Sequence, residues 1–109
     1  MAITVKRGDT GEGWEFPLVD SNGVAVDLTG NSGLQLKAKW DTLPLATAYK
    51  INAACTLSGL ATAGVVRYAP VAANVDTAGV MLYEVEVTFP AGPRTFADAA
   101  PYIVVEPDL

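Results

Sequence analysis

The chain has 109 residues, of which 50% are apolar and 17% are charged, and its net charge is −5. This length predicts one domain, residues 1–109, that folds without a disulfide or a metal. Only seven Lys and Arg residues are present and they are scattered, which argues against nucleic acid as a partner. No run approaches the ~18 apolar residues of a membrane span, so no membrane partner is expected.

The low charge has two interpretations. One is an ordinary all-β domain with an alanine-rich surface, and the other is a surface that lacks charge because it packs against other subunits. Cys55 has no second cysteine to pair with, which fits synthesis in a reducing compartment. The first nine residues include Lys6, Arg7 and Asp9, so no secretory leader is expected there.

Alternation of apolar and polar residues predicts strands through most of the chain. After a short first strand, residues 7–13 form a glycine-rich loop. The second strand contains Pro17, which lacks an N–H and therefore favours a sheet edge or a bulge. Asn22-Gly23 then predicts a tight hairpin turn, with residues 24–28 returning as the partner strand.

Two longer segments continue the pattern. Residues 34–40 alternate cleanly, and Trp40 closes their inward row, so it is predicted to lie in the core. Residues 49–57 alternate in the same way and place Cys55 inward, as a small buried hydrophobe. Residues 71–78 allow one helical turn at most. The predicted strands are 3–6, 14–19, 24–28, 34–40, 49–57, 66–68, 79–89, 94–96 and 102–106. This spacing predicts an all-β antiparallel sandwich of about seven to nine short strands.

The segment 79–89 is the clearest predicted strand, and the rest of the fold is expected to be organised around it. It is about ten residues long, whereas strands usually have five or six, so neighbours are expected on both sides. Its inward row is Met81, Tyr83, Val85, Val87 and Phe89.

The start of this strand is apolar on both faces. Val80 and Leu82 fall on the outward row, which further along holds Glu and Thr. A sandwich sheet normally shows water a polar outer face, so these residues are expected to be covered. The last strand adds the consecutive apolar residues 103–105. The predicted interface with another subunit is Val80, Leu82, Ile103 and Val105.

A second explanation for these apolar residues stays within the chain. The segment 71–78, or the N-terminal loop, could fold over them instead of a partner. Single exposed apolar residues are common in any case.

The usual catalytic side chains are missing. The sequence has no histidine, which excludes Ser/His/Asp and Cys/His arrangements and the common zinc site. Glu84 and Glu86 share one strand face and are interpreted as a solvated face rather than a glycosidase pair. No catalytic residue and no cofactor is therefore expected, and the chain is predicted not to be an enzyme.

Two loop patterns have ordinary interpretations. The spacing of the loop carboxylates fits no EF-hand calcium site, so no metal is expected; these residues are Asp9, Glu12, Asp20 and Asp27. Arg7-Gly8-Asp9 spells the tripeptide that integrins read, but the favoured interpretation is a turn in which Asp9 bonds nearby backbone.

The order of the weak turn and strand motifs is more informative than any one of them. In order they are Lys6-Arg7-Gly8-Asp9-Thr10, the hairpin with Asp20, Asn22 and Gly23, Val26-Asp27-Leu28-Thr29-Gly30, the strand ending at Trp40, Gly64-Val65-Val66-Arg67-Tyr68, the strand from Gly79 to Thr88, Gly92, Thr95-Phe96, and Tyr102-Ile103-Val104-Val105. Over nearly the whole chain this order resembles the immunoglobulin-like N-terminal domain of phage baseplate upper proteins and similar phage tail modules. The resemblance implies an immunoglobulin-like β-sandwich.

The resemblance also implies a function. Members of this family are structural modules of the tail or baseplate, joined to a C-terminal fibre or receptor-binding part. This sequence ends at Leu109, so we expect a stand-alone connector, adaptor or decoration subunit of a bacteriophage virion. It would be made in the bacterial cytoplasm and would bind other phage structural proteins as a homo- or hetero-oligomer.

The alternative is a recognition module that binds a carbohydrate or a cell-surface ligand through its loops. Trp14 and Trp40 both fall on inward strand faces, which leaves few aromatic side chains for such loops.

Overall fold

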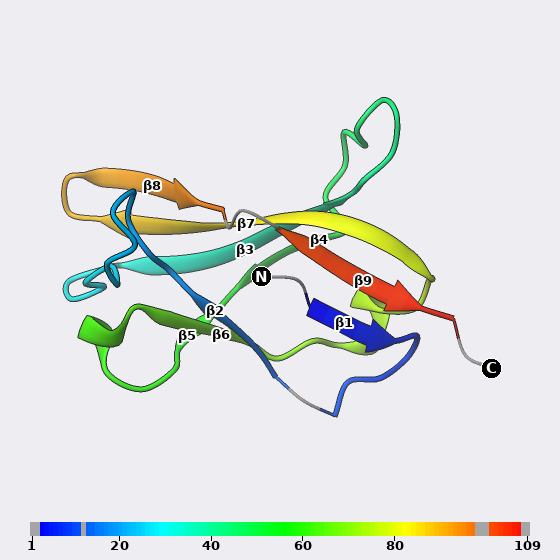
Figure 1. Ribbon diagram of the computed structural model, residues 1–109, viewed down its shortest axis with the longest axis horizontal. Coiled ribbons are helices and arrows are strands. Elements are labelled where there is room, and N and C mark those ends of the chain that lie inside the picture. The colour runs from blue at the N-terminus through cyan, green and yellow to red at the C-terminus, as the bar shows by residue number, and fades with distance from the viewer. Residues whose placement is uncertain (1–2, 12, 98–100, 108–109) are drawn as a thin grey trace.

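The computed structural model describes residues 3–11, 13–97 and 101–107. These residues form nine strands in two sheets and two short 3-10 helices, Ala61–Ala63 and Ala72–Asn74. The predicted all-β class and sandwich architecture are therefore confirmed (Figure 1). The strands are β1 (Ile3–Lys6), β2 (Trp14–Pro17), β3 (Gly33–Trp40), β4 (Ile51–Ala54), β5 (Thr56–Leu57), β6 (Val65–Tyr68), β7 (Gly79–Phe89), β8 (Gly92–Phe96) and β9 (Tyr102–Glu106).

The larger sheet has the strand order β1-β9-β7-β3-β4, with β8 also paired to β7. The pair β1–β9 is parallel, and the other pairs of this sheet are antiparallel. The smaller sheet has the order β2-β6-β5 and is antiparallel. In Figure 1 the two sheets form two layers, with the smaller sheet below the larger one.

The strand β7 is long because three other strands pair with it. Along one side it pairs with β3 over eight residue pairs. Along the other side, residues 79–82 pair with β9 and residues 85–89 pair with β8. The prediction that this long strand has neighbours on both sides is confirmed, with two short strands sharing one side.

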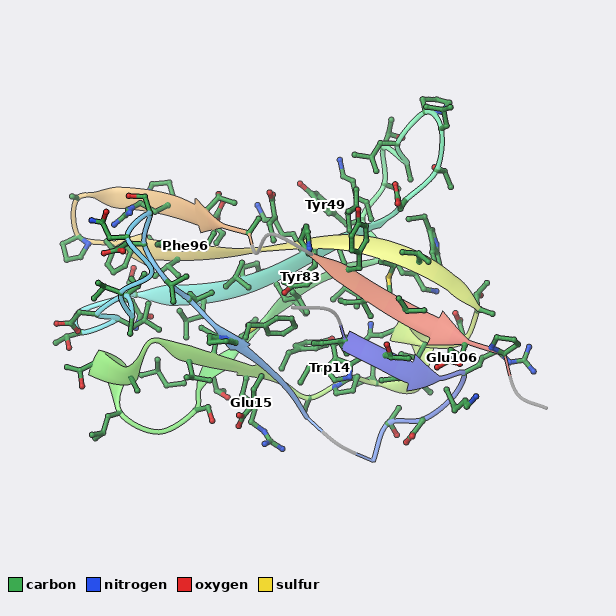
Figure 2. All side chains as sticks on the ribbon, viewed as in Figure 1. Trp14, Glu15, Tyr49, Tyr83, Phe96 and Glu106 are labelled. Atoms are coloured by element: carbon green, nitrogen blue, oxygen red, sulfur yellow. The ribbon has the colours of Figure 1, made fainter. Side chains whose placement is uncertain are left out.

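The core lies between the sheets and is filled by the inward rows that alternation predicts. Phe16 of β2 and Tyr83 of β7 meet across it with ring centroids 4.8 Å apart, and Trp14 packs against Tyr68 at 5.9 Å. Figure 2 shows Trp14 and Tyr83 between the sheets, and Glu15 on the opposite side of β2. The largest fully buried side chains are Phe16, Leu28, Leu36, Ile51, Met81, Ile103, Val66, Val75, Val85, Val87 and Val105.

Two expected strands differ from the structure. The segment 49–57 is not one strand, because β4 belongs to the larger sheet and β5 to the smaller one, with Cys55 between them. The segment 24–28 forms no strand and makes only an isolated bridge between Val19 and Ala25. The backbone N–H of Leu28 bonds instead to the carbonyl of Ala61, which draws this segment away from a regular ladder.

Other local predictions hold. Pro17 lies in β2, at an edge of the smaller sheet, where its missing N–H leaves no gap in a ladder. The predicted turn forms with Gly23 at φ +78°, and the Asp20 carboxylate accepts hydrogen bonds from the backbone N–H groups of Asn22 and Val24. Trp40 packs against the core but stays partly exposed, because it is the last residue of β3.

Candidate assembly surface

The outer face of the larger sheet has a strip of apolar side chains. Val80 of β7 lies directly opposite Val104 of β9, and Leu82 lies opposite Tyr102. Val80 and Tyr102 are each 38% exposed, and Leu82 and Val104 are partly buried. We call these four residues the apolar strip. It interrupts the polar outer face that an antiparallel sheet normally shows to water.

Two of the predicted interface residues do not belong to this strip. Ile103 and Val105 have 0% and 2% of their surface exposed and lie in the chain's own core. Their register with Met81 and Gly79 turns them inward, because directly paired residues point to the same face of a sheet. They cannot contact another subunit, and Val104, on the opposite face, takes their place.

The described part of the chain leaves the strip partly exposed. The segment 71–78 and the N-terminal loop meet each other, since the backbone N–H of Gly8 donates to the carbonyl of Val75 at 2.7 Å. Val75 is fully buried in the core. Within the described part of the chain, Val80 nevertheless keeps more than a third of its surface open to water.

Beside the strip, two rows of opposite charge run along neighbouring strands. Lys37 and Lys39 lie on β3, and Glu84 and Glu86 lie on β7, with Lys37 directly opposite Glu84. Lys37 Nζ lies 3.2 Å from Glu86 Oε2. The hydrogen bond that Lys37 donates to Glu86, more than the Glu86 charge, raises the pKa of Lys37, although desolvation opposes it. Glu86 is therefore paired with Lys37, and Glu84 lies directly opposite it.

The segment 41–49 stands away from the larger sheet on the side opposite the smaller sheet (Figure 1). We call it the arm. Leu43 is fully exposed, and Leu45 and Tyr49 are each nearly half exposed. No charged residue lies between Asp41 and Lys50. An apolar segment that projects into water is the usual mark of a contact with another molecule.

The base of the arm is held on both sides. The backbone N–H of Asp41 donates to the carbonyl of Val80 at 2.9 Å, which places the arm beside the start of β7. On the returning side, Lys50 Nζ bonds to Asp76 Oδ1 at 2.6 Å. This hydrogen bond lowers the pKa of Asp76. The arm therefore projects from a fixed base.

A shallow hollow of about 350 Å³ lies where the arm meets the outer face. Tyr49 forms part of it, and Lys39 Nζ lies 4.7 Å from the centroid of the Tyr49 ring. Figure 2 shows Tyr49 at the foot of the arm, above the larger sheet. The hollow is lined by Lys37, Lys39, Leu45, Tyr49, Leu82, Tyr83, Glu84, Ala97 and Pro101. Through Leu45, Tyr49 and Leu82, it connects the arm with one end of the apolar strip.

The loop carboxylates act locally. Asp9 Oδ1 accepts the backbone N–H of Gly11 at 3.1 Å, which confirms the turn interpretation of Arg7-Gly8-Asp9. Asp27 accepts both the hydroxyl and the backbone N–H of Thr29, and these bonds lower its pKa. Glu12 lies outside the described residues. Among the described residues, no three His, Cys, Asp or Glu side chains gather where they could hold a metal ion.

Cys55 lies where the chain passes from the larger to the smaller sheet. It packs against the core, as predicted, but is only partly buried. Burial raises the pKa of its thiol to about 11, which leaves little thiolate at neutral pH. Cys55 therefore behaves as an apolar side chain rather than as a nucleophile.

A second hollow, of about 550 Å³, lies at the other end of the molecule beside the β7–β8 hairpin. Arg94 lines it, and its guanidinium lies 5.0 Å from the centroid of Phe96 and 5.9 Å from that of Phe89. Asp20 and Asp27 lie on the facing loop, but both are engaged by their own turns. We therefore place the candidate site at the arm and strip.

Sequence reasoning found only part of this surface. It singled out Val80 and Leu82 but predicted no role for residues 41–46, between two expected strands. The signal was available, because the run from Thr42 to Tyr49 is uncharged and includes two leucines. A loop with that composition is unusual on a free surface.

Comparison of this chain with protein-family models, curated proteins and solved structures finds no significant match. None of the helices in the described residues has the length and hydropathy needed to cross a membrane. The function is therefore inferred from the residues of the chain itself.

Proposed function

We propose that this chain is a non-enzymatic structural subunit of a bacteriophage tail or baseplate, which acts by packing against other virion proteins. The observation that carries the proposal is the exposed apolar surface of the strip and the neighbouring arm. Charge is depleted at the centre of protein interfaces, and aromatic side chains are enriched there. The strip supplies Val80, Leu82, Val104 and Tyr102, and the hollow beside it adds Leu45 and Tyr49.

The proposal includes an immunoglobulin-like topology. The order β2-β6-β5 corresponds to strands B-E-D of that fold, and β9-β7-β3-β4 corresponds to G-F-C-C′. On this assignment β8 is an extra strand between F and G. This order supports the resemblance to the phage baseplate modules, and through it a place in the virion after synthesis in the host cytoplasm.

The test is to replace Val80 and Leu82 together by lysine. If a partner covers the strip, the double variant stays folded but loses self-association or incorporation into particles, because an interface centre tolerates charge poorly. Light scattering and thermal melts of the wild-type and variant proteins measure both effects. A wild-type protein that stays monomeric and enters no larger complex would refute the proposal.

A recognition module is the second candidate, and one observation favours it. Tyr49 lies partly exposed beside Lys37, Lys39 and Glu84 around the 350 Å³ hollow. A ring next to a few polar groups is a common arrangement in small-ligand sites. Binding of soluble oligosaccharides by the wild-type monomer, lost in Tyr49→Ala, would favour this candidate over assembly.

A further inference from the structure

We propose that the partner on this surface is a second copy of the chain, related by a two-fold axis that runs parallel to the strands between β3 and β7. The inference rests on the proposed function, since it names the partner of the same surface. Closed two-fold dimers are the commonest protein assemblies, and each copy then presents the same patch. The patch must therefore complement itself.

The charged rows meet this requirement. A two-fold axis between β3 and β7 places β3 of one copy over β7 of its partner, with the position along the strands unchanged. Lys37 of one copy then faces the level of Glu84 of the other, because these residues are directly opposite each other within one chain. Both glutamates lie on the same outward face as the lysines. Lys37 of each copy therefore meets Glu84 of the other, while Lys39 comes level with Leu82 and Glu86 comes level with Gln35.

The arm meets the same requirement with apolar contacts. It leaves the sheet on the β4 side, at the end where Asp41 bonds to Val80. The pair Val80–Val104 lies at this same end, with Val104 on the β9 side. The two-fold rotation places the β4 side of one copy over the β9 side of the other. Positions along the strands do not change, so each arm lies over Val104 and Val80 of the other copy.

The shape of the molecule agrees with this arrangement. The arm rises from the outer face, away from the smaller sheet (Figure 1). When the two outer faces pack against each other, each arm contacts the strip of the other copy. This contact buries Leu43 and Leu45 along with the strip. Stable interfaces bury about 800 Å² per partner, and the arm extends the contact beyond the flat sheet.

Charge reversal tests the proposal. The lysine-reversed variant has Lys37→Glu and Lys39→Glu, and the glutamate-reversed variant has Glu84→Lys and Glu86→Lys. Each variant alone sets like charges against each other across the axis, so its dimer dissociation constant is expected to rise by about tenfold or more. An equimolar mixture of the two variants is expected to form heterodimers. Sedimentation velocity at about 100 µM detects dimers of micromolar affinity.

Two controls separate this result from loss of folding. The quadruple variant with all four reversals keeps opposite charges within the chain and across the axis, so it is expected to form dimers. Glu15→Lys with Arg67→Glu reverses an exposed pair on the smaller sheet and is expected to leave dimerisation unchanged. Circular dichroism melts of each variant show that it is folded.

Three results would overturn the second-copy proposal. They are a monomeric wild type at this concentration, variants that dimerise as well as the wild type, and a mixture that stays monomeric although both components are folded. If the wild type is monomeric but Val80→Lys with Leu82→Lys prevents incorporation into particles, a different virion protein is the partner. The proposed function then stands without the two-fold dimer.

Discussion

Trp40 illustrates how a single position tests the packing. It faces inward, packs against the core and remains partly exposed. Truncation of a fully buried tryptophan to alanine lowers the free energy of unfolding by about 3 to 5 kcal/mol. Because Trp40 is only partly buried, Trp40→Ala is expected to lower it by about 2 kcal/mol. Urea denaturation measures this loss. Leu60→Ala, at a position 76% exposed, is the control and should change stability by less than about 0.5 kcal/mol.

Gly79 leaves the space that the Trp40 ring occupies. Its φ is +154°, and a Cβ there would lie 2.8 Å from Cζ3 of the Trp40 ring. Gly79→Ala is therefore expected to destabilise the protein by about 1 to 3 kcal/mol. Gly23→Ala is the control for backbone strain alone, because φ at Gly23 is also positive (+78°) but a Cβ there meets no atom within 4 Å. Equal melting temperatures for Gly79→Ala and the wild type would show that the ring is free to move.

Cys55 gives a prediction that depends on pH. Its thiol pKa is raised to about 11 by burial, so at pH 8 alkylation is expected to be roughly a hundredfold slower than for a free cysteine. The rate should rise as the pH approaches 11. The same shift favours the folded state below the pKa of the unfolded thiol, and this contribution is lost as the pH rises through the folded value. Alkylation at the same rate in native buffer and in urea would contradict the burial.

For single residues, alternation predicts which side chains point into the core only where apolar and polar residues alternate. It placed Tyr83 inward and Glu84 outward correctly. It had no such signal in residues 103–105, which are all apolar. Their facing is set by pairing with Met81 and Gly79 on β7, a long-range contact that no local pattern contains. That is why Ile103 and Val105 were expected at an interface and lie in the core.

At the scale of elements, the sequence predicts strands better than it predicts sheets. Residues 49–57 alternate without interruption, yet Cys55 separates two strands of different sheets. Alternation has the same period in either sheet, so it cannot mark such a crossing. The length of β7, by contrast, predicted neighbours on both sides, because a long strand presents many backbone groups that need partners.

The arm is the element whose role can be tested in isolation. Leu43 is fully exposed and Leu45 nearly half exposed, so Leu43→Asp with Leu45→Asp should leave the melting temperature of the monomer within about 2 °C of the wild-type value. Self-association should weaken sharply, because the arm contacts the partner. Light scattering measures the association. Leu60→Asp, at an exposed position outside the surface, should leave it unchanged.

At the scale of the molecule, the two outer faces differ in kind. The smaller sheet shows water the charged pair Glu15 and Arg67, which are about half exposed. The outer face of the larger sheet carries the apolar strip beside the two charged rows, and the arm projects from this face. This asymmetry is typical of a subunit with one free face and one covered face.

The most direct measurement of this difference between the two faces is the reactivity of a thiol placed on each face of the assembled protein. In a Cys55→Ala background, Val80→Cys reports on the larger sheet and Arg67→Cys on the smaller one. Maleimide should label both positions in the dissociated monomer. In the assembled protein we predict that the thiol at position 80 is protected while the thiol at position 67 reacts at its monomer rate. Equal labelling of the two positions in the assembled state would contradict the account.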